Sequence, residues 1–223
     1  MLQLFGFPVF TKSLIDYNYD RDKLIKTIES NYKIKKNRDE WDGDPKFQHS
    51  NMHHSINDEN NKIFTQPDYS SVGIHYENCI QEFFNELKLK SDIKYSWKIV
   101  NYTCMENDMY MRSHTHVNGD DFTAVHYLQY DDSHNNSTFY ENPSSHAQYL
   151  RYIRPNLYPC FYSHNIENSY LYENFKLATK QDDFVIIPSC LPHSIQRVKT
   201  NKLRITIVHF MKTHHRMLSI YDI

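Results

Sequence analysis

The sequence predicts a mainly β protein with flanking helices, and three observations indicate this class. After residue 90, short segments rich in Tyr, Val, Ile, Phe and Thr follow one another. Polar or proline-containing turns separate these segments. Helical spacing of apolar residues occurs in the first 90 residues. Strands in direct succession favour a β-sandwich or barrel over alternating strand–helix units. We therefore expect a β core with an N-terminal helical flank.

A short strand and a helix are expected near the N-terminus. Residues 4–10 alternate aromatic and aliphatic side chains, which is typical of a strand. After Asp20, a candidate N-cap, apolar residues recur at helical spacing. These residues are Leu24, Ile25 and Ile28. A helix is therefore predicted to begin at Asp20.

A long loop and a second helix complete the predicted flank. Residues 35–61 are polar and poor in aliphatic side chains, so we expect a loop there. Between residues 76 and 89, a single apolar stripe predicts a helix. The stripe consists of Ile80, Phe83, Phe84 and Leu87.

Six strands are predicted in the rest of the chain, with no internal repeat and no linker between them. They span residues 97–103, 109–116, 122–130, 138–141, 183–188 and 203–210. A second long loop is expected over residues 142–172. We expect a single domain over residues 1–223. It divides into a helical and loop flank (1–92), a β core (93–212) and a tail (213–223).

Composition excludes several function classes. With 25 Lys and Arg against 27 Asp and Glu, the net charge is −2, so we expect no nucleic-acid partner. Only 4 glycines are present, and no glycine-rich phosphate motif occurs. No apolar stretch approaches the ~20 residues that span a bilayer, and the first residues lack a basic segment followed by a long apolar one. The 4 cysteines are scattered, without a CxxC pair. We expect a cytoplasmic protein without a membrane partner.

Three histidines form the candidate metal site. Residues i and i+2 of a strand share a face, so the imidazoles of His114 and His116 converge. His193 follows the apolar run 184–187, and a rolled sheet brings such a segment beside the first. Imidazole is a ligand for Fe, Zn, Cu and Ni, so the three residues predict a metal site.

A chance origin of the histidine pattern is the alternative. The chain has 14 histidines, so a His-x-His pair also arises without function. The adjacent pairs His53-His54 and His214-His215 point to opposite sides of any strand and lie in polar surroundings. We interpret both pairs as surface residues.

Arg204 is the candidate anion-binding residue. It begins an alternating strand eleven positions after His193, and Thr206 shares its face. A guanidinium inside a barrel needs an anionic partner. That partner is either a structural carboxylate of this chain or the carboxylate of a small ligand, and the sequence leaves both alternatives open.

As an ordered set, these segments resemble the Fe(II)- and 2-oxoglutarate-dependent oxygenases, especially their prolyl-hydroxylase-like branch and short oxygenases predicted in bacteria and tailed phages. The resemblance covers about residues 97–210. It is carried by Ile99-Val-Asn-Tyr102, Tyr110-Met-Arg-Ser-His114-Thr-His116-Val-Asn-Gly-Asp120, Ala124-Val-His-Tyr127-Leu128, Asp183-Phe-Val-Ile-Ile-Pro-Ser-Cys-Leu-Pro-His193 and Arg204-Ile-Thr206. It implies a double-stranded β-helix core, a jelly-roll of the cupin-like kind. It also implies Fe(II), 2-oxoglutarate and O2 as cofactors.

The resemblance also implies roles for individual residues. His114 matches the first iron ligand and His193 the distal one. Arg204 matches the residue that pairs with the far carboxylate of 2-oxoglutarate, and Thr206 matches the hydroxyl two positions later. Two tyrosines match cosubstrate-binding positions. Tyr127 matches one that supports the same carboxylate, and Tyr102 matches one near the metal and the cosubstrate.

Position 116 departs from the family pattern, which is usually His-x-Asp or His-x-Glu. His116 here replaces the carboxylate, so the negative charge that would offset one of the two positive charges of a bound metal ion is missing. Either His116 completes a three-histidine site, or Asp120 or Asp121 provides the missing carboxylate, or the site binds another metal or has lost its chemistry. We favour the first alternative because strand geometry already directs His116 inward.

The resemblance implies an oxygenase that hydroxylates an unidentified substrate, with a peptidyl proline as the first expectation. The loops over residues 35–71 and 142–172 are candidate cleft walls, and the second carries Arg151 and Arg154. Two alternatives stay open. One is a cupin-like metalloprotein without 2-oxoglutarate chemistry, which does not need Arg204. The other is a binding or structural protein that has lost turnover. The oligomeric state is left open.

Overall fold

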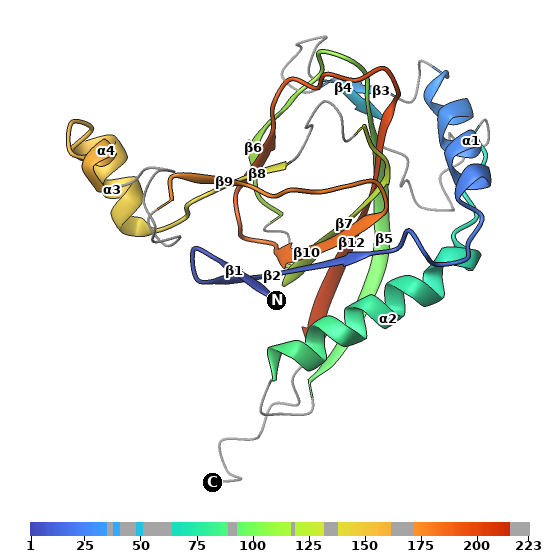
Figure 1. Ribbon diagram of the computed structural model, residues 1–223, viewed down its shortest axis with the longest axis horizontal. Coiled ribbons are helices and arrows are strands. Elements are labelled where there is room, and N and C mark those ends of the chain that lie inside the picture. Colours follow the sequence, from blue (N-terminus) through green and yellow to red (C-terminus); the bar gives the residue numbers. More distant parts are fainter. Residues whose placement is uncertain are drawn as a thin grey trace, which may run out of the picture.

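The core of the computed structural model is a pair of antiparallel β-sheets (Figure 1). The structure describes residues 1–34, 38–40, 48–50, 64–88, 93–116, 119–131, 138–161 and 172–214. The major sheet has six strands in the order β1-β2-β10-β7-β12-β5. Its strands are β1 (Leu2–Leu4), β2 (Phe7–Ser13), β5 (Lys94–Met105), β7 (Phe122–Gln129), β10 (Asp183–Pro188) and β12 (Arg204–His214).

The minor sheet has four strands in the order β6-β11-β8-β9. Its strands are β6 (Met111–His114), β8 (Thr138–Glu141), β9 (Asn174–Lys176) and β11 (His193–Ile195). A separate antiparallel pair joins β3 (Arg38–Glu40) to β4 (Gln48–Ser50). The minor sheet faces one side of the major sheet, and this arrangement confirms the predicted double-stranded β-helix core.

Two helices cover the opposite side of the major sheet (Figure 1). These are α1 (Arg21–Tyr32) and α2 (Ser70–Leu87). Their apolar stripes pack on the sheet in one buried cluster, in which α2 contributes Tyr76, Ile80 and Phe83. Burial of such side chains stabilises the fold by about 1.5–3 kcal/mol each. The helices therefore pack on the face of the major sheet that lies opposite the minor sheet.

Strand alternation divides β12 between the core and the inner face of the two sheets. Ile205 and Ile207 point to the helices and belong to the buried cluster. Arg204 and Thr206 point to the other side, toward the minor sheet, where they line a cavity. Because successive side chains of a strand alternate, the same strand both packs the core and lines the cavity.

Most predicted elements are confirmed, and two of them have the predicted bounds, β8 and β10. Asp20 occupies the N-cap of α1, although its side chain makes no capping hydrogen bond. Helix α2 begins at residue 70, six residues before the predicted start. The strand predicted over residues 4–10 is two strands, because Phe5 and Gly6 form a turn with positive φ angles of 54° and 87°.

The expectation of a loop over residues 142–172 is wrong for its first part. That part contains α3 (Ser145–Ile153) and α4 (Tyr158–Phe161), and residues 162–171 lie outside the described ranges. Within the predicted loop 35–61, β3 and β4 are strands and the remainder is not described. The pair His53-His54 and His215 also lie outside the described residues. The domain boundaries stay a prediction. Among the described helices, none is long and apolar enough to cross a membrane.

Candidate metal centre

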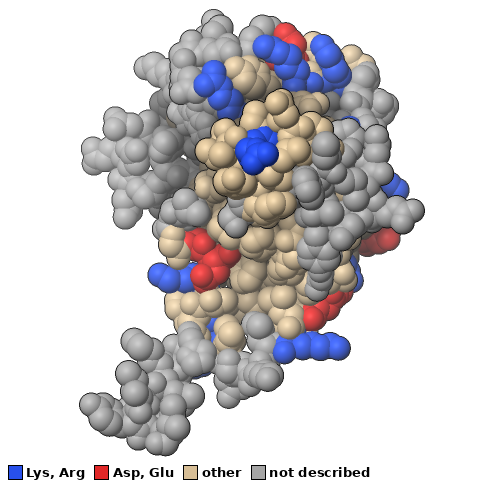
Figure 2. Space-filling model, turned by 90° about the vertical axis from the view of Figure 1, so that its left-hand side faces the viewer, with Lys and Arg blue, Asp and Glu red and all other residues tan. Residues whose placement is uncertain are grey.

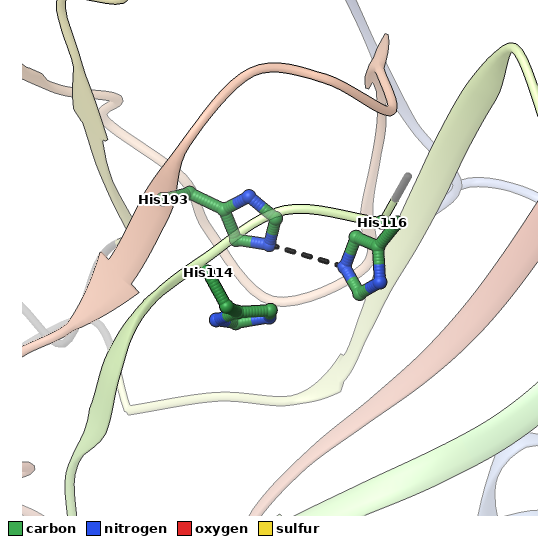
Figure 3. Close-up of side chains that lie close together, drawn as sticks. All are labelled: His114, His116 and His193. Atoms are coloured by element: carbon green, nitrogen blue, oxygen red, sulfur yellow. Dashed lines mark hydrogen bonds between the residues drawn. The ribbon is translucent and has the colours of Figure 1, made fainter. Parts of the chain in front are cut away.

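Three histidines from two segments about 80 positions apart converge on one point (Figure 3). The candidate ligand atoms of His114, His116 and His193 all lie within 4.8 Å of one another. Nε2 of His116 lies 3.3 Å from Nε2 of His193. The ring centroids of His114 and His193 are 4.4 Å apart. The predicted convergence of His114 and His116 is therefore present, and His193 joins them. The predicted strand over residues 109–116 is shorter, because β6 ends at His114 and His116 lies beyond it.

The β-ladders explain this convergence. His193 is the direct partner of His114 in the antiparallel pairing of β11 with β6. His116 lies two residues beyond the end of β6, and its backbone N–H donates to the Ser189 carbonyl at 2.8 Å. Ser189 follows β10, so this bond ties the His116 segment to the turn that leads to His193. Backbone pairing thus places all three imidazoles before any metal binds.

Two of the imidazoles are held in a metal-binding tautomer. Nδ1–H of His114 donates to the Arg112 carbonyl at 2.9 Å, and Nδ1–H of His193 donates to the Leu191 carbonyl at 2.9 Å. A neutral imidazole that donates from Nδ1 keeps the lone pair on Nε2. Both Nε2 atoms are therefore ready to coordinate a metal ion.

Burial keeps the three imidazoles neutral. Burial, followed by repulsion from the neighbouring rings of His114 and His116, lowers the pKa of His193 to about 3. Burial, followed by repulsion from His114, lowers the pKa of His116 to about 4. The pKa of His114 is also lowered by burial. Metal ligands must be deprotonated, so these shifts favour metal binding at neutral pH.

The histidines line a cavity of about 250 Å³ between the two sheets. Its lining combines the three imidazoles with Arg204 and hydroxyl-bearing and apolar side chains. The other lining residues are Asn101, Thr103, Met111, Thr115, Val125, Thr138, Tyr140, Ile187, Ile195, Thr206, Val208 and Phe210. A cavity of this kind, mostly apolar with a few convergent polar groups, is typical of a small-molecule site.

Arg204 is a buried cation without an anionic partner among the described residues. Its side chain is 1% exposed, and it makes no ion pair with any carboxylate in the described ranges. Its Nε has no hydrogen-bond partner there. Nη1 contacts the Met105 sulfur at 3.8 Å, and the guanidinium lies 5.3 Å from the Tyr127 ring. Burial lowers the pKa of Arg204, yet a guanidinium stays charged in proteins. Of the two partners that the sequence left open, the structure favours a ligand carboxylate.

Hydroxyl groups surround the guanidinium side of the cavity. The Thr206 hydroxyl lies 2.5 Å from the Thr103 hydroxyl, opposite it in the β12–β5 ladder. The Tyr127 hydroxyl lies 2.7 Å from the Thr138 hydroxyl. Thr206 lines the cavity, whereas Tyr127 supports Arg204 from behind through its ring. The structure thus brings both residues to the Arg204 end of the site.

Tyr102 does not reach the cavity. It lies on the face of β5 that packs against α1 and α2, and it is 1% exposed in the buried cluster. Its neighbours Asn101 and Thr103 face the cavity instead. The position near metal and cosubstrate that we expected for Tyr102 is therefore corrected to a core position, and no ligand role follows for it.

The two aspartates considered as third ligands are not among the converging groups. In the described part of the chain, the three histidines form the candidate cluster without a carboxylate. The Asp121 carboxylate accepts hydrogen bonds from the Thr213 N–H at 2.7 Å and from its hydroxyl at 2.6 Å. Asp120 is not part of the cluster either. The geometry favours His116 over both.

Sequence reasoning missed three further lining residues, Thr103, Thr138 and Tyr140. Tyr140 is the direct partner of His193 in the β8–β11 ladder, with ring centroids 6.1 Å apart. Thr138 lies two positions earlier on the same face of β8. The alternation of β8 was a usable signal for this pair, but its pairing with β11 was not visible in the sequence.

Comparison with known proteins gives a match in structure only. No protein-family model matches the chain, and no curated protein matches it significantly. Among solved structures, it is similar to SnoK, a non-heme α-ketoglutarate-dependent carbocyclase from nogalamycin biosynthesis. The identity is 12% and the TM-score 0.57, over 93% of this chain and 81% of that chain. The chain has the fold of the Fe(II)- and 2-oxoglutarate-dependent oxygenases.

Two other solved oxygenase-fold structures are similar over most of their length. A prolyl hydroxylase from Trichoplax adhaerens, in complex with a peptide fragment of the hypoxia inducible factor oxygen degradation domain, has 8% identity and a TM-score of 0.51. That match covers 92% of this chain and 83% of the other. The α-ketoglutarate-dependent epimerase SnoN has 9% identity and a TM-score of 0.51, over 92% and 76%. The resemblance seen in the sequence is thereby confirmed for the fold.

Proposed function

We propose that this protein is an Fe(II)- and 2-oxoglutarate-dependent dioxygenase. The observation that carries the proposal is the buried Arg204, which has no carboxylate partner in the described part of the chain, in the same cavity as three converging neutral imidazoles. A buried cation without a partner costs several kcal/mol, so its retention is explained best by an anionic ligand. The oxygenase fold supports this interpretation.

The three histidines fit a divalent metal ion. The 3.3 Å between the Nε2 atoms of His116 and His193 is close to the ~3 Å that separates two neighbouring ligands at metal–nitrogen bonds of about 2.1 Å. Imidazole is a suitable ligand for Fe and Zn alike. His114, His116 and His193 would hold the metal, and the cavity leaves its remaining positions accessible.

Arg204 and Thr206 would hold the far carboxylate of 2-oxoglutarate. A guanidinium binds a carboxylate through two parallel charge-assisted hydrogen bonds, and the Thr206 hydroxyl adds a further donor. Tyr127 keeps the guanidinium in place through its ring, and its own hydroxyl is bound to Thr138. Bound iron would supply the coupled oxidation of 2-oxoglutarate and substrate by O2. The apolar wall of Val125, Ile187 and Val208 excludes water from the space beside the metal ligands.

The substrate proposal is hydroxylation of a peptide side chain, with proline as the first candidate. The prolyl hydroxylase from Trichoplax adhaerens has this fold, but so do a carbocyclase and an epimerase. One fold therefore supports several reactions, and substrate class needs its own test. A cytoplasmic location and the absence of a nucleic-acid partner remain part of the proposal.

The direct test is an anaerobic titration of the protein with Fe(II) and then with 2-oxoglutarate. We expect a visible metal-to-ligand charge-transfer band that saturates at one equivalent of 2-oxoglutarate. A folded, metal-loaded protein that shows no band contradicts the proposal. The matched variant Arg204→Met should load the metal and need far more 2-oxoglutarate for the same band.

His116 in place of a carboxylate favours one second candidate, a cupin-like metalloprotein without 2-oxoglutarate chemistry. Such a site would bind its metal equally well in wild type and in Arg204→Met, and it would not bind 2-oxoglutarate. Metal analysis of protein purified without added iron tests the third alternative, a binding or structural protein that has lost turnover. A lack of bound metal, with no thermal shift on adding Fe(II) or Mn(II), indicates a non-catalytic protein.

A further inference from the structure

The cavity is too small to enclose a large substrate. At about 250 Å³ it lies below the range of about 300–1,000 Å³ that encloses drug-sized ligands. Part of this volume belongs to the cosubstrate if the proposed function holds. Only a group of side-chain size then reaches the metal ligands. The body of a larger substrate must rest on the outer surface near the metal end.

An insertion leaves the minor sheet at that end. Strand β8 pairs Tyr140 with the metal-ligand candidate His193, and the chain departs from the sheet one residue after Glu141. It returns at β9, where Asn174 pairs with Glu141. Both ends of the insertion over residues 142–173 therefore adjoin Glu141 of β8, the strand that pairs with His193. Its helices α3 and α4 project from this side of the molecule (Figure 1).

One side of this insertion exposes large apolar side chains. Tyr149, Tyr152 and Ile153 occupy positions i, i+3 and i+4 of α3, which lie on one helix face. They are 51%, 72% and 62% exposed, and Leu157, in the turn that follows, is 37% exposed. We call these four residues the α3–α4 patch. Contiguous exposed apolar surface of this kind marks an interaction site.

Within the described part of the insertion, α3 and α4 pack against each other. Ala147, Leu150 and Tyr158 are buried against one another and hold α3 to α4. The Arg151 guanidinium donates to the Tyr158 hydroxyl at 2.8 Å and contacts the Glu173 carboxylate at 3.4 Å. The Asn142 side chain donates to the Tyr172 carbonyl at 2.8 Å. These contacts fix the patch relative to the edge of the metal site.

The exposed basic group beside the patch is Arg154, because the carboxylates of Glu173 and Glu141 offset the charge of Arg151. Residues 142–161 contain Arg151 and Arg154, and Glu141 and Glu173 lie at the two ends of the insertion. Arg151 is engaged with Glu173, whereas Arg154 is exposed and makes no ion pair with the described residues. In the view toward α3 and α4, uncharged side chains surround a basic group (Figure 2). A partner with an acidic group beside apolar ones complements this surface.

The size of the patch favours a short partner over a second copy of the chain. From the exposed fractions of its side chains, the patch offers on the order of 400 Å². A stable protein–protein interface needs about 800 Å² from each partner. Arg154, the exposed arginine that makes no ion pair with the described residues, is also not enough for a nucleic-acid backbone, which requires several cations. A short polypeptide segment fits best if it has apolar groups that contact the tyrosines and a carboxylate that binds Arg154.

We propose that the α3–α4 patch is the docking surface for a polypeptide substrate whose acidic and apolar residues lie beside the residue that is modified. This inference rests on the proposed function, because it assigns the substrate class of the same site. Tyr152 and Ile153 bind the apolar residues of the segment, and Arg154 binds its carboxylate. The segment then places one side chain in the cavity beside His193.

A peptide selection tests this surface without turnover. A phage-displayed library of random dodecapeptides is selected on the wild-type protein, with the double variant Tyr152→Ser/Ile153→Ser as the counter-selection target. We expect enriched peptides that combine Asp or Glu with apolar residues. Synthetic versions, measured by fluorescence anisotropy, should bind wild type at least tenfold more tightly than the double variant or Arg154→Glu. Ile74→Ser, which changes an exposed isoleucine on α2, should bind them like wild type.

Three results would overturn the docking surface. They are a selection without enrichment over the double variant, peptide binding that the double variant retains, and tight binding of a (dT)20 oligonucleotide that the double variant loses. Far-UV circular dichroism confirms that each variant is folded. A protein that forms the charge-transfer band but selects no peptide contradicts this inference alone. A protein that binds the peptides but not 2-oxoglutarate contradicts the proposed function.

Discussion

His114 and His193 are directly opposed in the β6–β11 ladder, and each donates its Nδ1–H to the carbonyl two residues before it, at 2.9 Å in both cases. This shared local bond turns both Nε2 lone pairs toward the same point. Strand pairing and two short backbone hydrogen bonds therefore position two of the three candidate metal ligands, whereas His116 lies beyond the end of β6.

Removing either opposed imidazole should abolish tight metal binding. We expect His114→Ala and His193→Ala each to weaken Mn(II) binding at least 100-fold in isothermal titration calorimetry, because two ligands remain from three. His214→Ala, at an exposed position at the end of β12, is the matched control and should bind like wild type. Equal affinity of His193→Ala and wild type would contradict the assignment.

Position 116 should accept a carboxylate. We expect His116→Asp to bind Fe(II) at least as tightly as wild type, since a carboxylate offsets one charge of the dication and restores the two-histidine, one-carboxylate pattern. Asn has the same shape as Asp but no charge, so His116→Asn should bind Fe(II) at least tenfold more weakly than His116→Asp. Competition with a chromophoric chelator under anaerobic conditions measures both. Loss of metal in His116→Asp but not in His116→Asn runs against a site at this position.

Arg204 should be harmful to stability and necessary for ligand binding. Replacing a buried, unpaired cation with a hydrophobic residue of similar length is often stabilising by about 1–4 kcal/mol. We therefore expect Arg204→Met to raise the free energy of unfolding in urea without 2-oxoglutarate present. The same variant should bind 2-oxoglutarate at least 100-fold more weakly, which corresponds to about 2.7 kcal/mol. Arg154→Met, at an exposed arginine, should change neither quantity. A destabilised Arg204→Met with normal ligand affinity indicates a structural partner for Arg204.

Stability should fall as the pH drops below about 6.5. His209 is fully buried under α2, and burial lowers its pKa to about 3 from an ordinary value of 6.5. Between these values the unfolded chain binds the proton that the folded chain excludes, so acid favours unfolding. At pH 5 one such group costs about 2 kcal/mol relative to pH 7.5. His209→Phe should reduce the difference between urea unfolding free energies at pH 7.5 and pH 5 by about that amount. An unchanged difference means that His209 is protonated in the folded protein.

The β core and the histidine pair were predictable because their signals are local. Alternation and apolar runs located β8 and β10 with their observed bounds. The i, i+2 rule predicted that His114 and His116 share one side of the chain, although only His114 lies on the observed strand β6. Their spacing to His193 and Arg204 carried the resemblance to the oxygenases. These signals need no knowledge of which strands pair.

The remaining features depend on pairing and register. Tyr102 was expected at the site, but a strand seen alone does not say which of its two faces is inward. The β5–β12 register turns Asn101 and Thr103 to the cavity and Tyr102 to the helices. Strands β9 and β11, of 3 residues each, are too short for a periodic signal. The missing carboxylate partner of Arg204 also became visible only in three dimensions.

A crystal structure grown anaerobically with Mn(II) and 2-oxoglutarate tests the central claim most directly. We predict one metal ion bonded to Nε2 of His114, His116 and His193, and a 2-oxoglutarate molecule whose far carboxylate is paired with the Arg204 guanidinium. A metal ion held by other residues, or an Arg204 paired with a carboxylate of this chain, would contradict the account.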